Sequence, residues 1–113
     1  MATEPRVQER RRGERVLIRI PIKVYAIGKD GKHVNEPGET VVVSRYGALL
    51  RTSTALKPGS QLELMNNFTQ EVEKFRVIWV SERPKEGHFD VGVEILAPRD
   101  DFWGIRFPQK PQR

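Results

Sequence analysis

The chain has 113 residues and no cysteine, and 20 Lys and Arg against 15 Asp and Glu give it a formal net charge of +5. This length suits one compact domain, and the absence of cysteine excludes disulfides, thiolate-held metals and a cysteine nucleophile. No apolar run approaches the roughly 20 residues of a membrane-spanning helix, and the N-terminus lacks a secretory signal. We therefore expect a soluble, cytoplasmic protein whose positive charge favours phosphate-bearing partners.

The N-terminal segment is basic and lacks apolar periodicity. Residues 1–15 mix five arginines with three glutamates, a composition typical of a flexible arm. We place the arm proper at residues 1–9, the folded domain at 10–107 and a loose C-terminal tail at 108–113.

The first strand is predicted from strict alternation. Every even position from Val16 to Ala26 is apolar, which is the period of a half-buried strand. Pro21 has no N–H group, so it should lie at an edge, a bulge or a bend. Asp30-Gly31 then predicts a tight hairpin turn.

The following segment is less regular. Residues 33–39 contain Asn, Pro and Gly, which predicts an irregular excursion or a frayed pair before a strand at 40–43. Ser44-Arg45-Tyr46-Gly47 interrupts this strand, and residues 48–51 resume an extended pattern.

Three further features complete the predicted sheet. A turn at 57–59 precedes a strand at 61–65, and the last strand has apolar residues at alternate positions from Phe89 to Ile95. Between residues 71 and 80 the apolar parity changes, which predicts a β-bulge near Lys74. This assignment places Phe75, Trp79 and Phe89 on the core side.

Five or six short strands without a long helix predict an all-β domain, a small antiparallel barrel or sandwich. Residues 99–108 hold three aromatics. We expect them to form a helical turn or plug that covers one barrel opening, and the alternative is an exposed patch for a partner.

Catalytic chemistry has few candidates. His33 and His88 lack metal-ligand spacing, and Glu71 and Glu73 lie one strand period apart on a predicted solvated face. The sequence has no glycine-rich phosphate loop and no nucleophile elbow. We therefore predict a protein that is not an enzyme and has no metal and no cofactor.

Two motifs suit recognition of a phosphorylated ligand. Arginine forks in Arg10-Arg11-Arg12-Gly13-Glu14-Arg15 match phosphate oxygens and the guanine N7/O6 edge, although the charge alone favours a solvated basic tail. In Ser44-Arg45-Tyr46-Gly47, the hydroxyl can bond a base and the glycine permits close approach, although this segment alone is simply a turn.

The order of these elements carries further information. An Arg-x-x-x-Arg element, a proline-containing strand, a Ser-x-x-Gly turn and the closing strand Asp90-Val91-Gly92-Val93-Glu94-Ile95-Leu96 follow one another. Together they resemble the PilZ domain family over residues 10–97. The resemblance implies a six-stranded antiparallel β-barrel and binding of cyclic di-GMP.

The resemblance also implies site residues, which are Arg11, Arg15, Ser44, Gly47 and Gly92. The arginine pair would grip phosphates and guanine edges, the turn would receive a guanine, and the glycine of the closing strand would border the site. Weaker candidates are Arg10, Arg12 and Arg45.

One position departs from the family pattern. The turn usually begins with Asp or Asn two residues before the serine, and here that residue is Val42. Val cannot accept from the guanine N–H donors, and a buried unmet donor costs on the order of 1–3 kcal/mol, or one to two decades in affinity. Thr40 and backbone carbonyls are the available substitutes.

Three functions follow from this pattern. The first is a cyclic di-GMP receptor whose arm is ordered by the ligand and signals to a partner protein. The second is a degenerate PilZ-like adaptor that no longer binds the nucleotide. The third, a basic nucleic-acid-binding barrel, ranks last because Tyr46 is the only non-core aromatic predicted near the arm.

Overall fold

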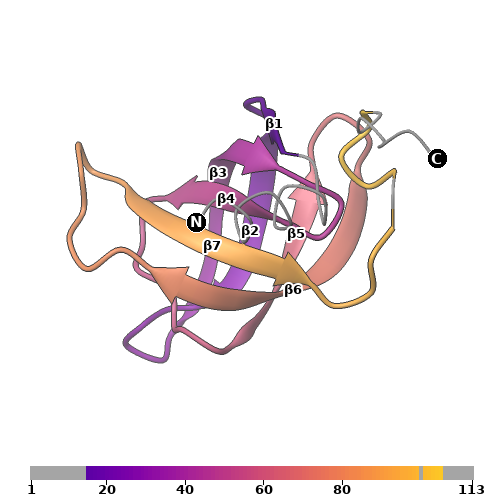
Figure 1. Cartoon of the computed structure of the whole chain (residues 1–113). Coiled ribbons are helices and arrows are strands. Elements are labelled where there is room, and N and C mark those ends of the chain that lie inside the picture. The colour runs from indigo at the N-terminus through magenta and orange to yellow at the C-terminus, as the bar shows by residue number, and fades with distance from the viewer. Residues whose placement is uncertain (1–14, 100, 106–113) are drawn as a thin grey trace, which may run out of the picture.

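The computed structural model describes residues 15–99 and 101–105, and Figure 1 shows an all-β architecture in which curved strands wrap around one another. The strands are β1 (Val16–Leu17), β2 (Pro21–Ile27), β3 (His33–Val43), β4 (Gly47–Thr52), β5 (Gln61–Asn66), β6 (Glu71–Val80) and β7 (Phe89–Ile95). The arm at 1–9 and the tail at 108–113 lie outside the described residues.

Six strands close into an antiparallel barrel. Around the ring, each strand pairs with the next in the order β2, β5, β6, β7, β4 and β3, and β3 pairs again with β2. The short β1 pairs with the end of β3 from outside the ring, at the top of Figure 1. The predicted six-stranded barrel is therefore confirmed, with one outer strand added.

A break at residues 18–20 divides the first predicted strand in two. Thr40, which is fully buried, fills this break: its hydroxyl donates to the Ile18 carbonyl at 2.6 Å and accepts from the Ile20 N–H at 2.8 Å. Pro21 follows as the exposed first residue of β2. The proline thus lies at the start of a strand, next to a break, and the buried hydroxyl satisfies the backbone groups that the break leaves unpaired.

The prediction of an irregular excursion at residues 33–39 is wrong. These residues form the first part of the continuous strand β3, in register with β2 from His33 to Glu39. Pro37 is tolerated because β4 pairs with β3 only from Glu39 onward, so this part of β3 has a strand on one side only. The Asp30-Gly31 turn before it is confirmed, with Gly31 at a φ of 86°.

The bulge in β6 lies at a different place from the one predicted. Lys74 pairs with Glu63 in an unbroken register, and the irregularity falls between Val77 and Trp79. One extra residue reverses which face the following side chains occupy. Phe75 and Val77 therefore point into the core, whereas Trp79 is turned outward, and its predicted core position is wrong.

Aromatic side chains close one end of the barrel. Phe102 and Trp103 are buried against Phe75, with ring centroids 4.8–5.9 Å apart. At the opposite end of β2, the fully buried Leu56 forms a bridge with Gly28. The aromatic cover is confirmed for Phe102 and Trp103, whereas Phe107 lies outside the described residues. Residues 101–105 are turns and bends rather than helix.

In the part of the chain that the structure describes, no helix is long and apolar enough to cross a membrane.

Candidate functional site

A groove of about 640 Å³ lies on the outer side of the barrel, between the β3–β4 turn and the second half of β6. It collects residues that are far apart in the sequence. Every predicted ligand residue of the main set that the structure describes lines it: Arg15, Ser44, Gly47 and Gly92. Folding thus brings together these four residues of the set that the resemblance singled out, and the fifth, Arg11, lies outside the described residues.

The β3–β4 turn is built by short local hydrogen bonds. The Ser44 N–H donates to the Gly47 carbonyl at 2.9 Å, and the Ser44 hydroxyl accepts from the Tyr46 N–H at 3.1 Å. A hydroxyl that accepts one bond still has a proton to donate. The turn therefore presents a preorganised donor to the groove.

Close packing requires a glycine at both Gly47 and Gly92. A Cβ on Gly47 would lie 2.1 Å from the Val93 carbonyl oxygen, so no larger residue fits without moving backbone. A Cβ on Gly92 would lie 2.9 Å from Nε1 of Trp79, because the indole packs directly over this glycine. Gly47 keeps β4 close to β7, and Gly92 makes room for a tryptophan.

An apolar row crosses the groove floor. Five residues on neighbouring strands pair with one another in register. They are Leu17 of β1, Val42 of β3, Leu49 of β4, Gly92 of β7 and Trp79 of β6. Trp79 remains 48% exposed and Tyr46 44% exposed at the groove. Sequence analysis missed Trp79 because nothing in the sequence marks the bulge that turns it outward.

The arginine candidates divide into three groups. Arg15 is exposed and lines the groove beside β1. Arg10, Arg11 and Arg12 lie outside the described residues. Arg45 sits partly buried on the turn and is not part of the groove lining.

Val42 occupies the groove floor, and Thr40 cannot take over its missing polar role. Val42 lines the groove from β3. The Thr40 hydroxyl is fully buried and already bonds both Ile18 and Ile20. Another residue or a backbone group must therefore accept the hydrogen bonds from the N–H groups of any guanine bound here.

The C-terminal cover is bonded directly to the site turn. Nε1 of Trp103 donates to the Ser44 carbonyl at 3.1 Å, and Nδ2 of Asn66 donates to the Phe102 carbonyl at 2.9 Å. These two bonds fix the cover between the β3–β4 turn and the end of β5. The position of the turn thus depends on the cover.

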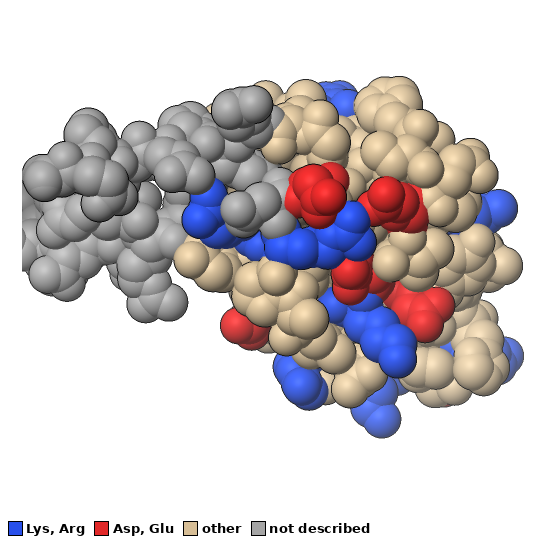
Figure 2. Space-filling model, turned by 90° about the vertical axis from the view of Figure 1, so that its right-hand side faces the viewer, with Lys and Arg blue, Asp and Glu red and all other residues tan. Residues whose placement is uncertain are grey.

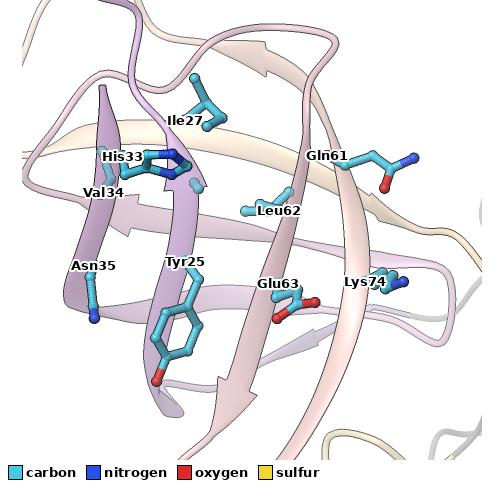
Figure 3. A pocket seen from close by; sticks show the side chains of 10 residues that line it. Tyr25, Ile27, His33, Val34, Asn35, Gln61, Leu62, Glu63 and Lys74 are labelled. Atoms are coloured by element: carbon cyan, nitrogen blue, oxygen red, sulfur yellow. The ribbon is translucent and has the colours of Figure 1, made fainter. Parts of the chain in front are cut away.

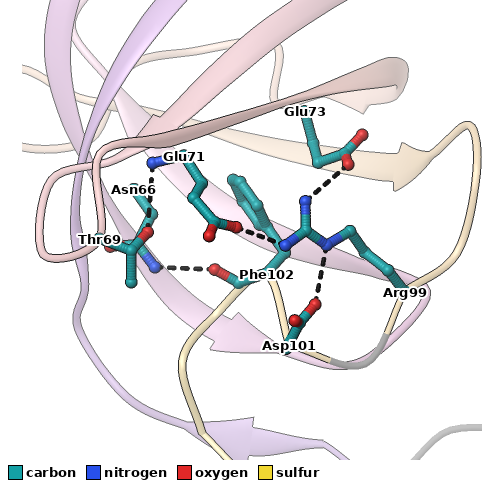
Figure 4. Close-up of polar contacts among 7 residues, drawn as sticks. All are labelled: Asn66, Thr69, Glu71, Glu73, Arg99, Asp101 and Phe102. Atoms are coloured by element: carbon teal, nitrogen blue, oxygen red, sulfur yellow. Dashed lines mark hydrogen bonds and ion pairs between the residues drawn. The ribbon is translucent and has the colours of Figure 1, made fainter.

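Arg99 anchors this cover electrostatically (Figure 4). Its guanidinium donates to Glu73 at 2.9 Å, to Asp101 at 2.8 Å and to Glu71, and it lies 5.8 Å from the Phe102 ring centroid. Hydrogen bonds to these carboxylates, that to Glu73 foremost, raise the pKa of Arg99, and its bond to Asp101 lowers the pKa of that carboxyl. Glu71 and Glu73, predicted to be simply solvated, instead hold Arg99.

Acidic and basic side chains alternate over the face that Figure 2 turns toward the viewer. Such interleaving gives no extended field of one sign. The described residues of this face therefore form no continuous basic surface of the kind that a nucleic-acid backbone would require.

A second hollow, of about 500 Å³, lies over β2, β3, β5 and β6 (Figure 3). Tyr25, Glu63 and Lys74 project into it from neighbouring strands in register. His33 also lines it, whereas His88 is exposed in the β6–β7 loop. Within residues 15–99 and 101–105, no three His, Asp or Glu side chains are placed to hold a metal ion.

Comparison with known proteins identifies the family. No curated protein matches the chain. The PilZ domain matches residues 9–102, which is most of the sequence and includes the whole barrel. The chain therefore belongs to the PilZ domain family, a family of non-catalytic domains that typically bind cyclic di-GMP.

Proposed function

We propose that this chain is a cyclic di-GMP receptor and that the groove at the β3–β4 turn is its binding site. One observation carries the proposal: Arg15, the Ser44 and Gly47 of the β3–β4 turn, and Gly92, which belong to three separate parts of the sequence, line a single groove. These are positions that match the family's nucleotide motifs. The aromatic rings of Tyr46 and Trp79 add surfaces on which a purine can stack.

The two sides of the groove would bind different parts of the ligand, the arginine side its phosphates and the β3–β4 turn a guanine. The Arg15 guanidinium would hold a phosphate in a forked pair of hydrogen bonds, and Arg11 would supply a second fork, with Arg10, Arg12 and Arg45 as weaker contributors. The Ser44 hydroxyl and the bare backbone at Gly47 would receive a guanine.

The signal would be the position of the arm. Neutralising the ligand phosphates with Arg11 and Arg15 would draw the arm across the groove and create a surface for a partner protein. Limited proteolysis tests this step. Cyclic di-GMP should protect residues 6–15 in the wild type and not in Arg15→Ala, and equal protection in the variant would refute it.

The adaptor function is the second candidate, and Val42 favours it. This apolar residue lies in the floor of the groove, within the row that runs from Leu17 to Trp79. Phe102 and Trp103 do not support this alternative, because both are buried.

Isothermal titration calorimetry separates the two functions. Cyclic di-GMP should bind the wild type saturably, whereas GTP should not, and Arg11→Ala/Arg15→Ala should lose binding. Arg83→Ala is the matched control, because Arg83 is exposed and does not line the groove. A flat titration with folded protein would favour the adaptor.

Two further experiments distinguish the candidate functions. Val42→Asp tests where the guanine edge lies. A gain of about one to two decades in affinity would show that the donors of the edge face Val42 and are unmet in the wild type. An unchanged or weaker affinity would show that no guanine edge lies at Val42 and that another groove residue accepts from its donors. Oligonucleotide binding that falls log-linearly with salt would instead support the nucleic-acid function.

A further inference from the structure

Trp79 is an exposed aromatic whose position is fixed by the backbone beneath it. Its indole packs over Gly92, where a Cβ would come within 2.9 Å of Nε1 and 3.2 Å of Cδ1. The ring remains 48% exposed at the groove. Rigid aromatic surfaces lose little conformational entropy when a flat ligand stacks on them.

Glu94 is the carboxylate of β7 that lines the same groove as Trp79. It is the next residue after Gly92 on the outer face, about 6.7 Å further along the strand, and it pairs in register with Gly47 of the site turn. Its side chain is exposed and lines the groove. Arg76 is its partner on β6, but no ion pair or side-chain hydrogen bond engages Glu94 within residues 15–99 and 101–105.

We propose that Trp79 stacks against a guanine of the ligand and that Glu94 accepts the N1–H and N2–H donors of its edge, the role for which Val42 is unsuited. This inference rests on the receptor function proposed above. A carboxylate has two oxygens and accepts both donors at once, and the edge of a stacked base extends a few ångströms beyond the ring beneath it. Trp79 and Glu94 are thus spaced to bind the face and the edge of one base.

Calorimetry with paired ligands tests the edge contact. Glu94→Gln should weaken cyclic di-GMP binding about tenfold. Cyclic di-IMP lacks the N2 amino group, so Glu94→Gln should weaken its binding by clearly less than tenfold. Glu63→Gln, an exposed glutamate outside the groove, is the matched control and should leave both affinities unchanged.

A second series tests the stacked face. Trp79→Leu should weaken cyclic di-GMP binding about tenfold, whereas Trp79→Phe should retain most of the affinity because it keeps an aromatic ring. Tryptophan fluorescence should change on titration of the wild type and much less on titration of Trp79→Phe, since the other tryptophan, Trp103, is buried in the cover and meets the site only through the Ser44 carbonyl. Melting curves confirm that each variant is folded.

The outcomes separate this inference from the function on which it rests. If the wild type binds cyclic di-GMP but Glu94→Gln and Trp79→Leu bind it equally well, the inference is overturned and the receptor function stands. Equal losses for both ligands in Glu94→Gln would overturn the edge contact. Absence of binding by the wild type would overturn both.

Discussion

Replacing Gly47 by alanine should destabilise the barrel far more than one methyl group suggests. The added Cβ would lie 2.1 Å from the Val93 carbonyl oxygen and 3.2 Å from the Glu94 Cα, and both are backbone atoms of a central strand. Restoring an ordinary contact requires a backbone shift of about 1 Å or more. The adjoining hydrogen bonds, from the Ile95 N–H to Tyr46 and from the Ser44 N–H to Gly47, would be distorted.

The expected cost is at the upper end of the range for overpacking, about 3 kcal/mol. For a domain of this size that lowers the melting temperature by roughly 12–24 °C. Urea unfolding followed by circular dichroism measures the loss. Gly28→Ala is the matched control, because its Cβ would meet mainly the movable Asp30 carboxylate, at 3.0 Å. Equal stability of the two variants would refute the reasoning.

Three further predictions concern the break at residues 18–20 and the C-terminal cover that contains Phe102 and Trp103. Thr40→Val should lower the free energy of unfolding by about 1–3 kcal/mol, since it leaves the Ile20 N–H without its partner; a loss below about 0.5 kcal/mol in urea titrations would contradict this. Arg99→Leu should cost about 1 kcal/mol in low salt and less in high salt, because charge pairing at a partly exposed site is screened; a salt-independent loss in thermal melts would count against it. The hydrogen bond from Arg99 holds the pKa of the Asp101 carboxyl in the folded protein below its value in the unfolded chain. The Arg99–Asp101 pair therefore stabilises the fold fully above the unfolded pKa of Asp101, and this stabilisation is lost as the pH falls through the folded pKa. Urea titrations should therefore show Asp101→Asn less stable than the wild type at pH 7 and equally stable in strong acid, and a constant difference would exclude this linkage.

The Gly47 result also determines how binding data are interpreted. Because this glycine is required by the approach of β4 to β7, loss of ligand binding in its variants would reflect a displaced turn. Arg15, Ser44, Trp79 and Glu94 are the informative positions, because their side chains face the groove without filling the core.

Local alternation was sufficient to predict most of the strands. The apolar even positions of β2 and the odd positions of β7 face the core as expected, since a period of two leaves only one buried face. The errors arose where a distant partner determines the conformation. Pro37 lies in a regular strand because β4 does not reach it, and the bulge falls beyond Val77 where β6 meets β7.

For the site, the sequence by itself determined the family motifs: the turn from Ser44 to Gly47, the glycine of the closing strand and the departure at Val42. Those motifs are local, because each consists of particular residue types at a fixed spacing along the chain. Only the tertiary structure decided that Trp79 and Glu94 share the groove and that Trp103 bonds the site turn. Barrel closure and one bulge bring these residues together, and both depend on pairing between strands distant in sequence, which no local pattern encodes.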